Sequence, residues 1–206
     1  MRKIIPALLL LHLVVPAAFG APGPAAADPV LRQLQHLAAA VNSLESDFVQ
    51  EKHLAMFREV LTSKGRFLFG KPDRLRWEIT EPVATGFIIQ GSEGRRWHQR
   101  TGRTESFDLA REPVMKLVAE QLMAWAAADF EKLGRQYRIS VLSEGPVLLK
   151  LEPMAGAEKF LDHLQVAFAA DGSHVQAVEV HEKDGDFTRL RFFNTRVNGP
   201  LPKDAF

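Results

Sequence analysis

Residues 71–82 have the sequence KPDRLRWEITEP, and this stretch decides the fold class. Leu75, Trp77 and Ile79 alternate with charged or polar residues, and a period of two is typical of a strand that is buried on one face only. The proline-containing pairs near the two ends are turn signals. The stretch therefore predicts one strand of an antiparallel sheet, with an apolar face against the core and a polar face in water.

The same alternation extends on both sides of this strand. Phe67 and Phe69 share one face before it, and Phe87 and Ile89 share one face after it. Clusters of turn residues separate the apolar runs at intervals of about 8–12 residues, which is typical of strands joined by hairpins. We therefore expect an antiparallel meander between residues 45 and 108.

The C-terminal third of the chain has the pattern again. Asp171-Gly172 and Asp184-Gly185 are strong hairpin signals, because glycine tolerates the positive φ that these turns need. Further strands are predicted at 137–142, 147–151, 163–169, 175–181 and 187–197.

Two segments have helical periodicity instead. Asp28 and Pro29 form an N-cap followed by a first-turn proline, and apolar residues then recur every three or four positions, which predicts a helix from about 29 to 42. Pro113 begins a second amphipathic helix that extends to about residue 128. The apolar faces are formed by Leu31, Leu34, Leu37, Val41 and Leu44 in the first helix and by Val114, Leu117, Val118, Leu122, Met123 and Trp125 in the second.

Residues 1–27 have the order of a cleavable secretion signal: a basic start, an apolar run and small residues, with cleavage after Gly20 or Ala27. The apolar run is shorter than the roughly 20 residues that span a bilayer, and a membrane anchor or a buried helix is the alternative. Residues 28–206 contain no linker or repeat. We expect them to form a single domain without a transmembrane segment, long enough to bury a core.

Charge and cysteine content exclude several classes of function. Residues 1–27 contain two of the 26 basic residues and none of the 25 acidic ones, so the remainder has a net charge of −1. A chain without a basic excess is not expected to bind nucleic acid or anionic lipid electrostatically. Because the chain has no cysteine, thiolate zinc sites, cysteine nucleophiles and lipid attachment through an N-terminal cysteine are also excluded.

The sequence contains no catalytic or phosphate-binding motif, and its histidines are scattered over separate elements. We therefore predict no catalytic residue, no metal, no cofactor and no enzymatic activity. The 14 phenylalanines and three tryptophans are more informative. A long, twisted sheet that is covered by two amphipathic helices can hold either a filled core or an apolar ligand cavity, and periodicity does not distinguish the two.

Five segments form an ordered set along nearly the whole mature chain. They contain an F-x-Q motif, a G-x-F motif, a basic-Pro strand with a tryptophan, a hairpin ending in tryptophan and a closing strand. The segments are Asp47–Gln50, Gly65–Phe69, Lys71–Pro82, Gly91–Trp97 and Phe192–Leu201. Together they resemble the LolA family of periplasmic lipoprotein carriers.

The resemblance implies an α+β, mainly β fold of the LolA and LolB type: a strongly curved antiparallel sheet, or incomplete β-barrel, closed by helices. It implies a periplasmic carrier of a Gram-negative cell that shields the acyl chains of lipoproteins or other lipidated molecules in an apolar cavity. The implied partners are this cargo, an inner-membrane ABC-type transporter and an outer-membrane receptor, and the carrier is expected to be a monomer. A non-transport module for lipid sensing or envelope assembly is the alternative.

Two features bear on the branch of the family. The outer-membrane receptor LolB is lipid-anchored through a cysteine, and the absence of cysteine favours a free carrier over that receptor. The chain stops at Phe206, where typical members continue into a further strand. This ending favours a LolA-related branch over the housekeeping carrier.

Lys71 stands where many family members have an arginine that bonds backbone carbonyls of the lid and holds the empty cavity closed. Lysine keeps the charge but lacks the planar fork of guanidinium donors. Lys71 is therefore the candidate latch, with Arg74 or Arg76 as substitutes and an ordinary turn lysine as the alternative interpretation. Alternation and the resemblance together predict a cavity wall formed by Leu34, Leu37, Phe48, Phe67, Phe69, Leu75, Trp77, Ile79, Phe87, Ile89, Trp97, Leu122 and Trp125.

Overall fold

The computed structural model describes residues 28–154 and 157–206. The predicted secretion signal at 1–27 lies outside the described residues. Within them, no helix is both long enough and apolar enough to cross a membrane.

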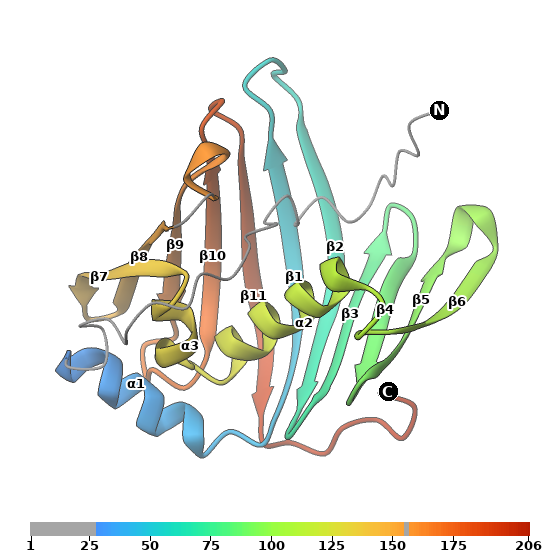
Figure 1. Cartoon of the computed structure of the whole chain (residues 1–206), viewed down its shortest axis with the longest axis horizontal. Helices are drawn as coiled ribbons and strands as arrows, with labels where there is room; N and C mark the ends of the chain where they lie inside the picture. Colours follow the sequence, from blue (N-terminus) through green and yellow to red (C-terminus); the bar gives the residue numbers. More distant parts are fainter. Residues whose placement is uncertain (1–27, 155–156) are drawn as a thin grey trace.

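All the strands that the structure describes belong to one antiparallel sheet with the order β6-β5-β4-β3-β2-β1-β11-β10-β9-β8-β7. The sheet is strongly twisted and curved, and its two edge strands, β6 and β7, lie at opposite ends of that order, so the barrel is incomplete (Figure 1). The predicted fold class is therefore confirmed. The strands are β1 (Ser43–His53), β2 (Val60–Gly70), β3 (Arg74–Glu81), β4 (Thr85–Gln90), β5 (Glu93–His98), β6 (Arg103–Asp108), β7 (Tyr137–Glu144), β8 (Val147–Pro153), β9 (Leu161–Phe168), β10 (Val175–Glu182) and β11 (Phe187–Val197).

Within residues 28–154 and 157–206, three α-helices lie across the concave face of this sheet: α1 (Pro29–Ala39), α2 (Pro113–Ala126) and α3 (Phe130–Gly134) (Figure 1). The same described residues include the single-turn 3₁₀ helices η2 (Gln99–Thr101) and η3 (Ala157–Lys159), which lie in connections. Buried residues of all three α-helices join the concave face in one apolar cluster.

α1 begins where the sequence predicts, because the Asp28 carboxylate accepts a hydrogen bond from the backbone N–H of Val30 at 2.8 Å. It ends at Ala39 and not at about residue 42. The Asn198 side chain accepts from the backbone N–H of Asn42 at 2.6 Å and donates to the carbonyl of Ala40 at 2.9 Å. These bonds direct the chain into β1, so Leu44 packs from a strand and not from the helix.

The second predicted helix is divided in two. α2 ends at Ala126, and Ala128 has a φ of 46°, which interrupts the helical backbone. Asp129 then caps the short helix α3 by accepting from the backbone N–H of Lys132 at 2.9 Å. The face also differs slightly from the prediction, since Val114 is exposed and Met115 is buried.

The predicted alternation in β2, β3 and β4 is confirmed by their register. Phe67 is opposite Trp77, and Trp77 is opposite Phe87, so the three side chains share the concave face. Full burial of a large apolar side chain contributes about 1.5–3 kcal/mol. This row, with its neighbours on adjacent strands, therefore supplies a large part of the stability.

The convex face is less polar than the sequence predicts. Leu68 and Ile88 alternate with the core residues and are nevertheless buried. The C-terminal segment lies over this part of the sheet: the Arg76 guanidinium donates to the carbonyl of Asp204 at 3.2 Å, and Ala205 is buried. A second, small apolar contact therefore exists outside the main core.

Candidate functional site

An aromatic cluster occupies the middle of the concave face. The Phe48 ring stacks on Trp77 with centroids 4.4 Å apart, and Phe67 and Phe192 meet the same tryptophan edge-on at 6.0 and 6.4 Å. Gly65 makes the arrangement possible, because a Cβ there would lie 2.3 Å from Cζ of Phe48. Rings in these offset and edge-on geometries attract one another beyond their burial of apolar area.

A cavity of about 40 Å³ lies between this cluster and α2. One water molecule occupies about 30 Å³ of liquid, so the cavity as it stands is far too small for an acyl chain. In this structure, side chains therefore leave little free space at this place under α2. The cavity is lined by Leu44, Ser46, Phe67, Trp77, Leu122, Trp125, Ala126, His174, Val175, Phe192 and Thr195.

Four residues of the predicted wall line this cavity: Phe67, Trp77, Leu122 and Trp125. Eight others do not line it. Leu37 is half-buried and packs with Leu34 near the β9–β10 turn at Gly172, and the other seven are buried in the apolar cluster. Those seven are Leu34, Phe48, Phe69, Leu75, Ile79, Phe87 and Ile89.

Trp97 lies on the convex face, so its prediction as a wall residue is wrong. In the register of β4 and β5 it is opposite Gly86, whereas the inward-facing Phe87 is opposite Arg96. The Arg76 guanidinium lies 5.3 Å from the centroid of the Trp97 ring. The phase of β5 is therefore the reverse of the predicted one, and a shift of one residue moves every side chain of a strand to the other face.

Phe192 and Thr195 line the cavity as well, although neither is among the predicted wall residues. A bulge in β11 brings Thr195 to this wall: the pairing with β1 shifts between Glu45 and Asp47, and Asn194 takes a φ of 53°. Asparagine is one of the few residues that adopts this conformation readily, and the Asn194 side chain also donates to Asp47 at 3.0 Å. The position of Phe192 on the concave face could have been predicted from the sequence, because Phe192 follows the apolar alternation of its strand.

Polar side chains also contribute to the cavity lining. The hydroxyls of Ser46 and Thr195 are 2.8 Å apart, and the Ser46 hydroxyl also lies 3.1 Å from the carbonyl oxygen of Phe193. Nδ1 of His174 is 2.8 Å from the Ser173 hydroxyl, which donates to Asp171 at 2.7 Å. Because that hydroxyl has a single hydrogen, His174 donates through Nδ1 in this arrangement.

Burial lowers the pKa of His174, and the nearby carboxylate of Asp171 offsets part of that effect. The imidazole is therefore held in its neutral form, which suits its place on an apolar cavity. Across the cavity, Nε1 of Trp125 is buried and has no hydrogen-bond partner among the described residues.

Lys71 contacts the last turn of α1. Its ammonium donates to the carbonyl of Ala39 at 2.7 Å and lies 3.5 Å from the carbonyl oxygen of Ala38. The Ala38 carbonyl also accepts from the backbone N–H of Val41 at 3.0 Å. A cation is favourable at this end of the helix dipole. Arg74 and Arg76 instead contact the C-terminal segment, through the Phe206 ring and the Asp204 carbonyl.

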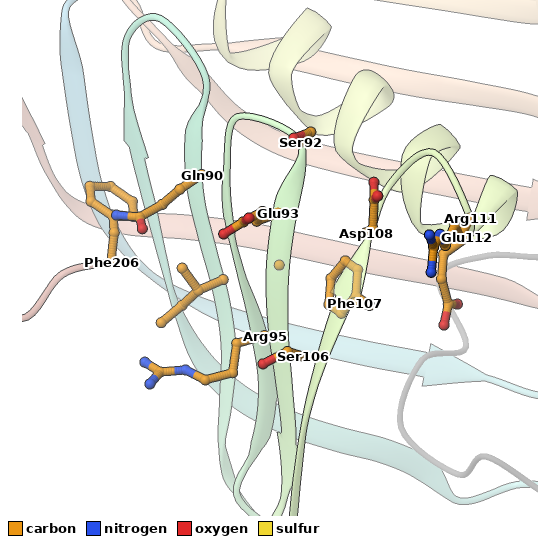
Figure 2. Close-up of a pocket in the computed structure, with 12 residues that line it drawn as sticks. Gln90, Ser92, Glu93, Arg95, Ser106, Phe107, Asp108, Arg111, Glu112 and Phe206 are labelled. Atoms are coloured by element: carbon orange, nitrogen blue, oxygen red, sulfur yellow. The ribbon is translucent and has the colours of Figure 1, made fainter.

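A larger hollow of about 730 Å³ lies at the other end of the sheet, where the β4–β5 turn and β6 approach the start of α2 (Figure 2). Its lining is largely polar, and includes the charged residues Glu93, Arg95, Asp108, Arg111 and Glu112. Burying an acyl chain there would remove these groups from water without giving them partners, which is unfavourable. The apolar cavity under α2 is therefore the better candidate site despite its small size.

No cluster of three or more histidine, aspartate or glutamate side chains within residues 28–154 and 157–206 is arranged to hold a metal ion. The histidines of β9 and β10 make other contacts. His163 and His181 stack with ring centroids 4.4 Å apart, and Nε2 of His181 is 3.0 Å from Glu179.

Comparison with known proteins gives consistent matches. The family described as "Outer membrane lipoprotein carrier protein LolA" matches residues 39–206. An outer-membrane lipoprotein carrier protein of Cupriavidus taiwanensis is 27% identical over 196 residues, covering 92% of this chain and 86% of that protein. Its counterpart in Pseudoalteromonas translucida is 23% identical over 210 residues, covering 100% and 92%.

A solved structure, the lipoprotein LppX of Mycobacterium tuberculosis, aligns with a TM-score of 0.47 at 13% identity. The alignment covers 86% of this chain and 100% of that one.

Proposed function

The chain belongs to the LolA family of outer membrane lipoprotein carrier proteins, and we propose that it carries acylated cargo across the periplasm. The cargo is a lipoprotein or another lipidated molecule whose acyl chains are shielded between α2 and the sheet. It is received from an inner-membrane ABC-type transporter and delivered to an outer-membrane receptor. The secretion signal assigned to residues 1–27 is the route to that compartment.

The observation that carries this proposal is the aromatic wall opposite α2. Phe67, Trp77 and Phe192 line the cavity from the sheet, and Leu122 and Trp125 line it from the helix. Exposing one methylene to water costs about 0.8 kcal/mol, so a chain of about fifteen methylenes loses roughly 12 kcal/mol in water. Burial against an apolar wall is non-directional, so it recovers that free energy for chains of different lengths. The proposed function requires no catalytic residue and no cofactor.

The volume of about 40 Å³ implies that the helices move when cargo binds. We assign the control of this movement to Lys71, and the support is that its ammonium ties the last turn of α1 to the start of the β2–β3 turn. A half-exposed hydrogen bond of this kind contributes about 0.5–1.5 kcal/mol. That is small beside the gain from burying an acyl chain, so cargo can displace the latch, which otherwise favours the closed state.

The test is to purify the mature protein from the periplasm of a Gram-negative host, extract it and identify bound lipid or lipopeptide by mass spectrometry. The purified protein is also titrated with a fluorescent apolar probe. We expect copurified acyl lipid and saturable probe binding that the extracted lipid displaces. If no lipid is found and the probe does not bind, the carrier function is rejected.

The filled interior favours one second candidate, a non-transport module for lipid sensing or envelope assembly. In that case the aromatic cluster is a permanent core and α2 does not move. This function predicts no probe binding, together with capture of a specific protein partner by cross-linking in the periplasm. The two functions therefore give opposite results in the probe titration.

A further inference from the structure

The indole of Trp125 is a hydrogen-bond donor in an apolar wall. The ring lines the cavity under α2 together with Phe67, Trp77 and Phe192. Among the described residues its Nε1 is one of the few buried side-chain polar atoms without a partner. An indole nitrogen can donate but cannot accept, and a donor that is left unpaired in an apolar site is unfavourable.

The other polar groups of this wall have partners within the protein. The Ser46 hydroxyl bonds with that of Thr195, and His174 bonds through Nδ1 to Ser173. Trp125 lies on α2, the element that must move to admit cargo. Because Trp125 moves with α2, opening of the cavity changes the surroundings of its N–H.

The surroundings restrict the chemistry of the acceptor. A hydrocarbon offers no acceptor at all. A free carboxylate or a phosphate would be buried as an uncompensated charge, because no lysine or arginine is among the described residues that line the cavity. The carbonyl oxygen of an ester is uncharged, accepts a hydrogen bond and is attached directly to the acyl chain.

We propose that the Nε1–H of Trp125 donates to the ester carbonyl of a bound acyl group, so that the carrier selects O-acyl esters over hydrocarbons and free fatty carboxylates. This inference rests on the proposed carrier function and names the chemical class of its cargo. The aromatic wall holds the acyl chain of the cargo. The hydrogen bond from Trp125 fixes the depth at which the carbonyl carbon of that acyl chain lies.

The test compares two probes that differ only at the acceptor: a monoacylglycerol and the monoalkylglycerol ether of the same chain length. An ether has no carbonyl and is a weaker acceptor. We expect the ester to bind the wild-type protein about 3- to 10-fold more tightly. In Trp125→Phe the ratio of ester affinity to ether affinity should be close to one. Any loss of packing in this variant weakens both probes equally and so cancels in the ratio. Trp97→Phe, on the convex face, is the matched control and should keep the wild-type ratio.

A second measurement does not depend on a variant at the site. The wild-type protein has three tryptophans, and their indole N–H signals can be followed by ¹⁵N NMR during each titration. The Trp125 signal should shift with the ester as expected for a newly formed hydrogen bond and respond much less to the ether.

The possible outcomes separate the two proposals. Equal binding of both probes to the wild-type protein leaves the carrier function standing and overturns the ester inference. A ratio that persists in Trp125→Phe overturns the assignment to this residue. Failure of both probes to bind rejects the carrier function, and the inference with it.

Discussion

The ammonium of Lys71 lies 2.7 Å from the carbonyl oxygen of Ala39, so a residue that follows β2 closes the C-terminal turn of α1. Lys71 thus contacts α1 through a single ammonium group, at the position where the resemblance to the family implies an arginine. The family arginine is expected to hold the cavity closed through several carbonyls, and here the contacts are confined to the end of α1. A weaker latch should open more readily.

Lys71→Met should increase the rate of probe binding several-fold, because it removes the bond that favours the closed state. Loss of this bond should lower the free energy of unfolding by no more than about 1.5 kcal/mol. Stopped-flow fluorescence and chemical denaturation measure the two effects. Lys64→Met is the control, since Lys64 pairs with Glu81 on the exposed surface. An unchanged binding rate in Lys71→Met would show that Lys71 is an ordinary turn residue.

Gly65→Ala should destabilise the fold by about 2–3 kcal/mol, a typical cost of overpacking a core. The added Cβ would lie 2.2 Å from the backbone oxygen of Glu78 and 2.3 Å from Cζ of Phe48. Gly145→Ala is the matched control, because a Cβ there meets nothing within 4 Å. Equal stability of the two variants in urea denaturation would mean that the aromatic cluster can rearrange without cost.

Glu45→Gln should lower stability at neutral pH by about 1–3 kcal/mol, the usual contribution of hydrogen bonds to a charged group. The largely buried carboxylate bridges three strands by accepting from Arg66 at 2.6 Å and from Arg196 at 2.7 Å. Glu81→Gln, which alters an exposed pair, should cost far less. Comparable losses in the two variants would contradict the bridging role.

The same bridge predicts a pH dependence. Burial acts to raise the pKa of Glu45, but the hydrogen bonds from Arg196 and Arg66 outweigh it and lower the pKa. A lowered folded pKa gives stability that is present above the unfolded pKa and is lost as the pH falls through the folded value. The difference in stability between wild type and Glu45→Gln should therefore shrink below about pH 4.

His174 should make the fold less stable on mild acidification. Burial lowers its pKa despite the nearby Asp171 carboxylate, so between the folded pKa and the unfolded value of about 6.5 the unfolded chain binds more protons. Stability should fall as the pH decreases through this window, and His174→Gln should flatten the profile. Urea denaturation at a series of pH values measures it, with His36→Gln on the exposed face of α1 as the control. If the free energy of unfolding of His174→Gln changes with pH as steeply as that of the wild type, other titrating groups cause the pH dependence.

The apolar alternation of β2, β3 and β4 is present in the sequence, and the sheet follows it. Phe67, Trp77 and Phe87 come from three consecutive strands and meet in one row, as their spacing predicts. The start of α1 is equally local, because Asp28 and Pro29 set the cap without help from the rest of the chain. Such features depend on neighbours in sequence, and their physical chemistry can be derived from the sequence alone.

Other features depend on residues more than one hundred positions apart. Asn198 ends α1 through Asn42, the β11 bulge brings Thr195 to Ser46, and the C-terminal segment reaches Arg76. No local pattern encodes these contacts. They decide where the helix stops, which polar groups enter the cavity wall and why part of the convex face is buried.

The sequence by itself determined the fold class and the period of the central strands, because short-range sterics and amphipathicity govern them, and it predicts an export signal at residues 1–27. Only the tertiary structure decided that Trp97 faces outward, that Lys71 reaches α1 and that the aromatic cluster leaves a cavity of only about 40 Å³ under α2. Those outcomes depend on the phase of each strand against the core and on how closely side chains from distant segments can pack.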